Sequence, residues 1–250
     1  MSDATSFVDL TSILFTLFWL FFIGLVLHLH REGKREGWPL QLNNGETARG
    51  VGGIPKPKTY RKAHGQGDRV RPGPDVPEYP INAEPLYNAN GAPLKPLGDP
   101  MVDGLGPAAW ANRAEQPDLT VDGRPRIVPL RVDPEHSVVS NDPNPIGKAV
   151  FGCDGAQAGT VVDLWVDRAE PMFRYAELDI AGKRVLLPMT LARVSKSGEV
   201  NVRSIRSDQF QQVPTLANPD QITLQEEDKI VAFYGGGTLY AIPSRQEPRI

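Results

Sequence analysis

The sequence predicts a single N-terminal membrane-spanning helix followed by a mainly-β domain that contains a small antiparallel barrel and one short C-terminal helix. Three features support this: one apolar segment near the N-terminus, a middle rich in proline and glycine, and short alternating segments after residue 126. The 250 residues include 24 glycines and 24 prolines, which favours turns and extended segments over long helices. Lysine plus arginine (27) nearly balances aspartate plus glutamate (30), so composition gives no sign of a nucleic-acid partner.

The apolar segment runs from Leu10 to Leu29 without a formally charged side chain. Twenty helical residues at about 1.5 Å each match the roughly 30 Å hydrocarbon core of a bilayer, so we place a transmembrane helix at residues 11–30. A cleaved signal peptide is the alternative, and it needs a basic N-terminal region. The first nine residues carry Asp3 and Asp9 and no lysine or arginine, which favours a retained span.

The flanks of this segment predict its orientation. Arg31, Lys34 and Arg35 follow it directly, and positive charge remains on the cytoplasmic side of a membrane. Residues 1–10 are therefore expected outside and the remainder inside. The three basic residues are also candidates for contact with anionic lipid headgroups, and Trp38 is a candidate interfacial anchor.

Residues 31–110 show little periodicity and contain phrases such as GGIPKPKTY and RPGPDVPEYPINAEP. Disordered linkers usually lack large apolar residues, whereas isoleucine, leucine and tyrosine recur here. Of the two interpretations, a disordered linker and an extended strap with short strands lying on a partner, the composition favours the strap.

The remainder, residues 111–250, predicts a β-rich domain. The stretch 126–132 resembles a strand, and 159–167 alternates, so that Asp163, Trp165 and Asp167 are expected on the face opposite Val162, Leu164 and Val166. Further strands at 173–180 and 183–188 flank an Ala-Gly turn, and 192–205 resembles a hairpin turning at Ser197-Gly198.

A helix is predicted near the C-terminus. Thr223 and Glu226 have the spacing of a capping box, and the acidic run after Gln225 favours a helix N-terminus. Gly235 to Gly237 are expected to end the helix.

The sequence offers no recognisable catalytic motif. It lacks a P-loop, a GxGxxG after a strand and a GxSxG elbow. Two of its four histidines lie in the apolar segment, so neither a histidine-based active site nor a metal site is expected. Cys153 is the only cysteine, which excludes an intrachain disulfide and fits a reducing compartment. A single-span enzyme is thus disfavoured.

Acidic residues and arginine recur in WVDRAEPMFRY, where Asp167, Glu170 and Arg174 surround a predicted hairpin turn. An ordinary surface ion pair is one interpretation, worth under about 1 kcal/mol. A proton relay is the other, because burial raises a carboxyl pKa while a neighbouring arginine lowers it. Spacing alone does not decide between them.

Several ordered phrases resemble the H subunit of purple-bacterial photosynthetic reaction centres. They include FWLFF with REGKREGWPL, PKPKTY, GDPMVDGLGPAAW, GTVVDLWVDRAE and QITLQEEDKIVAFYGGGTLYA. The resemblance runs nearly end to end, and the segment from about 145 to 194 is similar to the PRC-barrel, the small β-barrel of this family.

The resemblance implies a non-enzymatic subunit that caps the quinone side of the L and M subunits, stabilises them and supports proton transfer to the secondary quinone. Bacteriochlorophyll, bacteriopheophytin, quinones, non-haem iron and carotenoid are expected in those partners, and none in this chain. A cytochrome subunit, a light-harvesting ring and membrane lipids are further candidate partners. The implied location is the bacterial inner (chromatophore) membrane, with a periplasmic N-terminus and a cytoplasmic main domain.

The resemblance also implies roles for individual residues. Glu170 is expected to be the principal relay carboxylate, Arg174 its tuning partner and Asp167 a more distal member.

The expected proton entrance differs from that of some relatives. Histidines follow an Asp-Gly pair in those relatives, whereas Arg124 and Arg126 follow Asp122 here. Arginine does not release its proton at working pH, which weakens the expected entrance role of Asp122. His136 is a candidate substitute, although an ordinary surface histidine is the favoured interpretation of that residue. A membrane-tethered PRC-barrel module with a regulatory or interaction role outside photosynthesis is the alternative for the whole chain.

Overall fold

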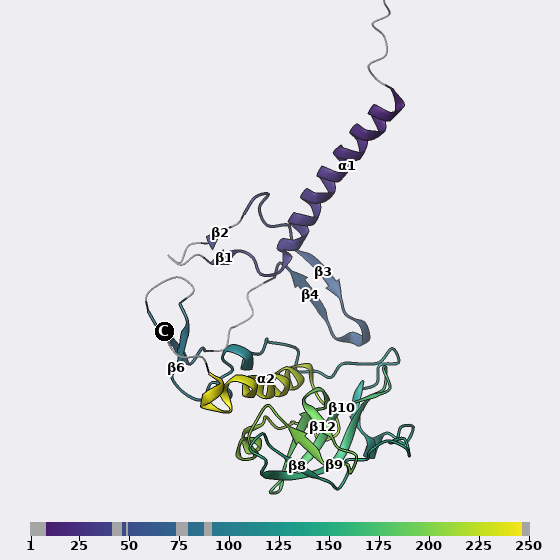
Figure 1. Cartoon of the computed structure of the whole chain (residues 1–250). Coiled ribbons are helices and arrows are strands. Elements are labelled where there is room, and N and C mark those ends of the chain that lie inside the picture. Colours follow the sequence, from purple (N-terminus) through teal and green to yellow (C-terminus); the bar gives the residue numbers. More distant parts are fainter. Residues whose placement is uncertain (1–8, 42–46, 49, 74–79, 88–91, 247–250) are drawn as a thin grey trace, which may run out of the picture. The chain divides into compact units, whose positions relative to one another are not determined.

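The computed structural model describes residues 9–41, 47–48, 50–73, 80–87 and 92–246. The chain divides into two compact units, residues 1–77 and residues 78–250 (Figure 1). The domain boundaries expected after residues 10, 30 and 110 stay predictions.

The first unit is dominated by helix α1, Leu10–Glu32, which continues into the 3₁₀ turn Gly33–Arg35. Asp9 caps the helix, its carboxylate accepting a hydrogen bond from the backbone N–H of Ser12 at 2.7 Å. None of the α1 residues is buried. Within the described part of the chain, this is the one helix long and apolar enough to cross a membrane, which agrees with the predicted span.

Short hairpins follow in both units. Strands β1 (Leu40–Gln41) and β2 (Thr47–Ala48) pair, as do β3 (Lys58–Arg61) and β4 (Asp68–Arg71). In the second unit β5 (Ala83–Pro85) pairs with β6 (Leu94–Pro96). The short strands expected in the middle of the chain are therefore present, and their contact with a partner stays a prediction.

The second unit is built on a seven-stranded sheet. Its order is β11-β10-β9-β8-β13-β12, with β7 pairing β9. The strands are β7 (Ile127–Pro129), β8 (Ala149–Phe151), β9 (Gln157–Asp167), β10 (Met172–Ile180), β11 (Lys183–Pro188), β12 (Ala192–Val194) and β13 (Val200–Val202). All pairs are antiparallel except β8 with β13, which run parallel. The strand expected over 126–132 is shorter, because Leu130–Val132 forms a 3₁₀ turn.

Further 3₁₀ turns connect these elements. They span Ala63–Gly65, Gly106–Ala108, Met189–Leu191, Ser207–Gln212 and Pro243–Arg245.

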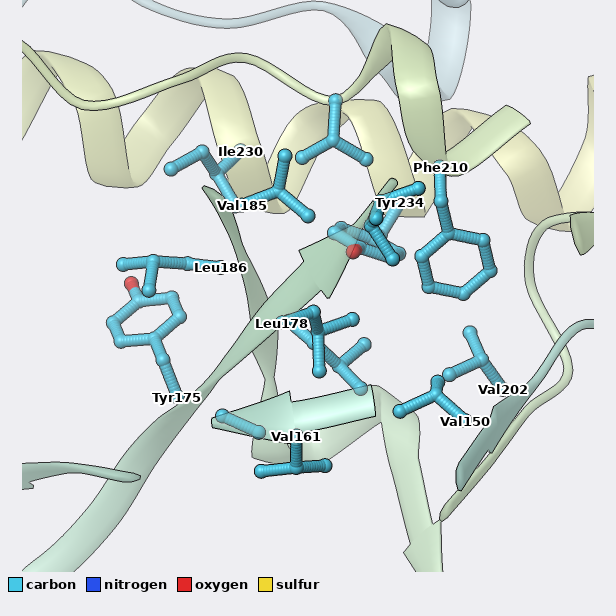
Figure 2. Close-up of a cluster of buried hydrophobic side chains, with 14 of the residues drawn as sticks. Val150, Val161, Tyr175, Leu178, Val185, Leu186, Val202, Phe210, Ile230 and Tyr234 are labelled. Atoms are coloured by element: carbon cyan, nitrogen blue, oxygen red, sulfur yellow. The ribbon is translucent and has the colours of Figure 1, made fainter. Parts of the chain in front are cut away.

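Helix α2, Leu224–Tyr240, packs on the sheet and closes the core. Figure 2 shows Ile230 and Tyr234 of this helix among side chains of the strands, including Leu178 and Val185. The capping box is present as predicted, since Thr223 Oγ1 accepts from the Glu226 N–H and the Glu226 carboxylate accepts from the Thr223 N–H.

One expectation for this domain is wrong. The three glycines do not end α2, which continues to Tyr240. They lie where other segments of the chain pack closely against the backbone of α2. A Cβ on Gly237, for example, would lie 2.7 Å from the Ser204 carbonyl oxygen. Both faces of β9 are covered at its C-terminal end, since Asp163, Trp165 and Asp167 are buried, as are Leu164 and Val166.

Candidate functional site

The candidate site begins at Asp167, the last residue of β9. Its side chain is buried, and Arg126 binds both carboxylate oxygens, with Nε at 2.9 Å from each. The N–H groups of Ala169 and Glu170 donate to Asp167 Oδ1 at 2.9 and 3.1 Å. Residue 126 is held here because Ile127 pairs with Asp167 in the β7–β9 ladder.

Arg126 joins Asp167 to two more carboxylates. Its Nη1 lies 3.4 Å from Asp118 Oδ2, and its Nη2 lies 3.5 Å from Glu170 Oε1. The Glu170 side chain is 68 % exposed, so its carboxylate meets both the guanidinium and solvent. The structure therefore places Arg126 beside Glu170. The pairing of Glu170 with Arg174 that the resemblance implied stays a prediction.

The electrostatics of the pair follow from this geometry. Burial alone would raise the pKa of Asp167, but the Arg126 hydrogen bond and the two backbone N–H donors outweigh it and lower this pKa below its usual value. The same hydrogen bond, opposed by burial, raises the pKa of Arg126. Asp167 is thus a fixed negative charge near neutral pH.

Glu227, in the first turn of α2, is a site residue that the sequence analysis missed. Tyr175 donates its hydroxyl to Glu227 Oε2 at 2.8 Å. Burial raises the pKa of Glu227, and the Tyr175 hydrogen bond and the positive charge of Arg174 only partly offset this. Asp118 and Arg126 also act on Glu227, so it shares one electrostatic environment with the Arg126 cluster.

Arg174 is exposed and lies within electrostatic reach of Glu227. The sequence signal for Glu227 was the acidic run at a helix start, where a carboxylate is ordinarily explained by the helix dipole. Tyr175 lies 52 positions earlier, so no local pattern links the two residues.

The two entrance candidates are placed differently. Asp122 is exposed, and its nearest cation is Arg124, with 3.8 Å between Oδ2 and Nη2. His136 Nδ1 lies 3.0 Å from Oδ2 of buried Asp133, which also accepts from Arg168 Nε at 3.2 Å. Arg168 directly follows Asp167, so the His136 group adjoins the cluster along the chain. Both entrance roles stay predictions.

The basic residues at the end of α1 are engaged more deeply than expected. Lys34 is buried, donates to the Val51 carbonyl and stands 5.1 Å from the centre of the Trp38 ring. Arg35 binds both Glu32 carboxylate oxygens at 2.8 Å and also donates to two backbone carbonyls. These side chains stabilise the first unit, and Arg31 is exposed. Lipid contact by the four candidates stays a prediction.

Together these features define a class: a protein with an N-terminal helix long and apolar enough to cross a membrane, a β-rich domain, and a polar cluster at the end of strand β9. Residues 2–132 match the sequence model of the photosynthetic reaction centre, H-chain N-terminal region, and residues 138–209 match that of the PRC-barrel domain. The first match covers more than half of the chain, which therefore belongs to the H-chain family of the photosynthetic reaction centre.

Part of the chain is also similar to part of another protein. An uncharacterized protein of Deinococcus radiodurans is 39 % identical over 70 residues, which cover 26 % of this chain and 25 % of the relative. The chain thus spans about a quarter of that relative.

Proposed function

We propose that the chain is the subunit that caps the quinone side of the L and M subunits and supports proton transfer to the secondary quinone. Family membership supports a structural role in a reaction centre. The proposed orientation has the N-terminus in the periplasm and the β-rich domain in the cytoplasm, as the basic residues after α1 favour.

The observation that carries the proton-transfer role is the Arg126 cluster. One guanidinium lies within 3.5 Å of three carboxylates of different exposure. Around it lie Asp167, which is buried and stays charged, the exposed carboxylate of Glu170, and Glu227, whose pKa burial raises.

Each residue has a separate task in this proposal. Asp167 remains ionised and fixes Arg126. Glu170 is the relay carboxylate that faces water, because its side chain is exposed. Glu227 retains a proton to higher pH than an ordinary glutamate, and Tyr175 orients its carboxyl. A quinone that takes up two electrons needs two protons, since its reduced form is costly to keep charged away from water.

The first experiment tests the assignment itself. The chain is tagged, purified from its native membrane in mild detergent, and examined by near-infrared absorption. We expect bands of bacteriochlorophyll and bacteriopheophytin and two further membrane polypeptides. A colourless, solitary protein would contradict the proposal and favour the membrane-tethered PRC-barrel module.

The second experiment tests the relay by flash kinetics on the purified complex. Glu170→Gln and Glu227→Gln should each slow the proton-coupled second electron transfer to the secondary quinone by about tenfold or more, because a positioned proton donor contributes at least that much. Initial charge separation should not change. Glu115→Gln is the matched control, since Glu115 is exposed and outside the cluster. An unchanged second-transfer rate across pH would remove the tested residue from the relay.

A further inference from the structure

A hollow of about 350 Å³ lies in the second unit and shares no residue with the Arg126 cluster. It is bordered by the turn Met189–Leu191, the β12–β13 hairpin, the last turn of α2 and the turn Pro243–Arg245. Among the described residues, three arginines line it, Arg193, Arg203 and Arg245, and no carboxylate does. In the described part of the chain this hollow therefore has positive charge without a paired carboxylate, unlike the Arg126 cluster.

The three arginines are arranged in two ways. Arg193 of β12 pairs with Asn201 of β13. Arg203 lies two residues beyond Asn201, so it is on the same face of the hairpin, diagonally across from Arg193. Both side chains are exposed, and neither forms an ion pair within the described residues. Arg245 is fixed, because it donates to the carbonyls of Arg203, Ser204 and Gly237 at 2.8–2.9 Å.

Ser204 supplies an independent observation at the same place. It lines the hollow and is only 4 % exposed. Its Oγ is buried and has no hydrogen-bond partner in the described part of the chain. A buried hydroxyl without a partner costs free energy, so a ligand atom that bonds to it is stabilising.

We propose that this hollow binds a phosphate-class oxyanion, either as a free ion or as the phosphate of an anionic lipid headgroup. Arg193 and Arg203 supply planar donor forks that match phosphate oxygens, Arg245 adds fixed positive charge, and the Ser204 hydroxyl donates to the ligand. The C-terminal end of α2 lies beside the hollow, and its dipole disfavours an anion there. Arg245 offsets the negative end of this dipole, because its guanidinium donates a hydrogen bond to the Gly237 carbonyl.

Calorimetric titration of the full-length chain in a non-ionic detergent tests the proposal. Inorganic phosphate is one probe, and dihexanoyl phosphatidylglycerol below its micellar concentration is the other. Saturable binding of phosphate alone identifies a free ion, and binding of the lipid alone identifies a headgroup. Binding of neither probe overturns the proposal.

Paired variants show whether the arginines are responsible. The double variant Arg193→Gln/Arg203→Gln should weaken binding at least about tenfold, the loss expected for one charge-assisted hydrogen bond. The control Arg61→Gln/Lys196→Gln removes the same charge from exposed residues outside the hollow and should bind as the wild type does. Equal loss in both variants would indicate attraction to net charge only and would overturn the site.

Ser204→Ala separates binding from folding. It should weaken binding several-fold while leaving the unfolding temperature of the ligand-free protein equal or higher, because it removes an unpaired buried hydroxyl. Unchanged affinity with a lowered unfolding temperature would show that the hydroxyl has a structural partner and no role in binding.

Discussion

At the scale of the residue, Asp167 shows how a buried charge is held in this protein. Its carboxylate has lost contact with water and is compensated by Arg126 and two backbone N–H groups. Removing one partner of such a pair costs far more than the pair itself contributes, because the other charge remains partly desolvated. The same argument does not apply to Asp122, whose ion pair is exposed.

Asp167→Asn should therefore lower the free energy of unfolding by about 2–3 kcal/mol near neutral pH. Urea unfolding of the chain in mild detergent, followed by tryptophan fluorescence, measures this. Asp122→Asn is the matched control, with an expected change under about 1 kcal/mol. Equal effects of the two substitutions would show that the Asp167 pair is not buried in solution.

The pH dependence of this difference has a defined sign. The pKa of Asp167 is lowered in the folded protein, so its contribution is complete above the ordinary value of 3.8 and is lost as the pH falls through the lower folded value. The gap between wild type and Asp167→Asn should therefore shrink between about pH 5 and about pH 3. A gap that is constant over this range would contradict the assignment.

Part of this site is predictable from the sequence, because some of its residues are close together along the chain. Asp167 and Glu170 are three residues apart in one turn, so a local pattern could place them together. Arg126 reaches them through strand pairing across 41 positions, and Glu227 reaches Tyr175 across 52. Such contacts depend on tertiary packing, which alternation in a single strand does not encode.

At the scale of the element, helix α2 illustrates a conflict between local preference and packing. Glycine is unfavourable in a helix interior, so three in succession predict an end. The helix continues because Ala108 and residues 204–205 pack directly against its backbone. The capping box at its start is local chemistry and was predictable, whereas the close approach at its other end was not.

Gly237→Ala should accordingly destabilise the protein, although alanine is the better helix former by about 1 kcal/mol. The added Cβ would lie 2.3 Å from Ile205 Cγ2 and 2.7 Å from the Ser204 carbonyl oxygen. Gly235→Ala is the comparison, since its nearest neighbour is the Pro107 carbonyl oxygen at 3.1 Å. Thermal unfolding followed by circular dichroism should give Gly237→Ala a clearly lower unfolding temperature than Gly235→Ala. The reverse order would show that α2 packs differently.

At the scale of the whole molecule, the anchor and the β-rich domain have separate sources of stability. Every buried residue of the hydrophobic core lies between Met101 and Tyr234. The first unit is stabilised instead by polar contacts at the end of α1, notably those of Lys34 and Arg35. The hydropathy of the sequence predicted the anchor, and its turn residues predicted several strands, because both signals are local.

Residues 78–250 expressed without the first unit should therefore fold and remain in solution. The sheet, α2 and the whole described core are retained in this fragment. Trp165 is fully buried and Trp110 is half-buried, so the tryptophan emission of the fragment should shift to longer wavelength on unfolding, mainly through Trp165. A cooperative urea transition close to that of the full chain in detergent is the expected result. A fragment that is soluble but shows exposed tryptophan and no cooperative transition would mean that residues 1–77 are needed to complete the fold, and the two units would then have to be treated as one.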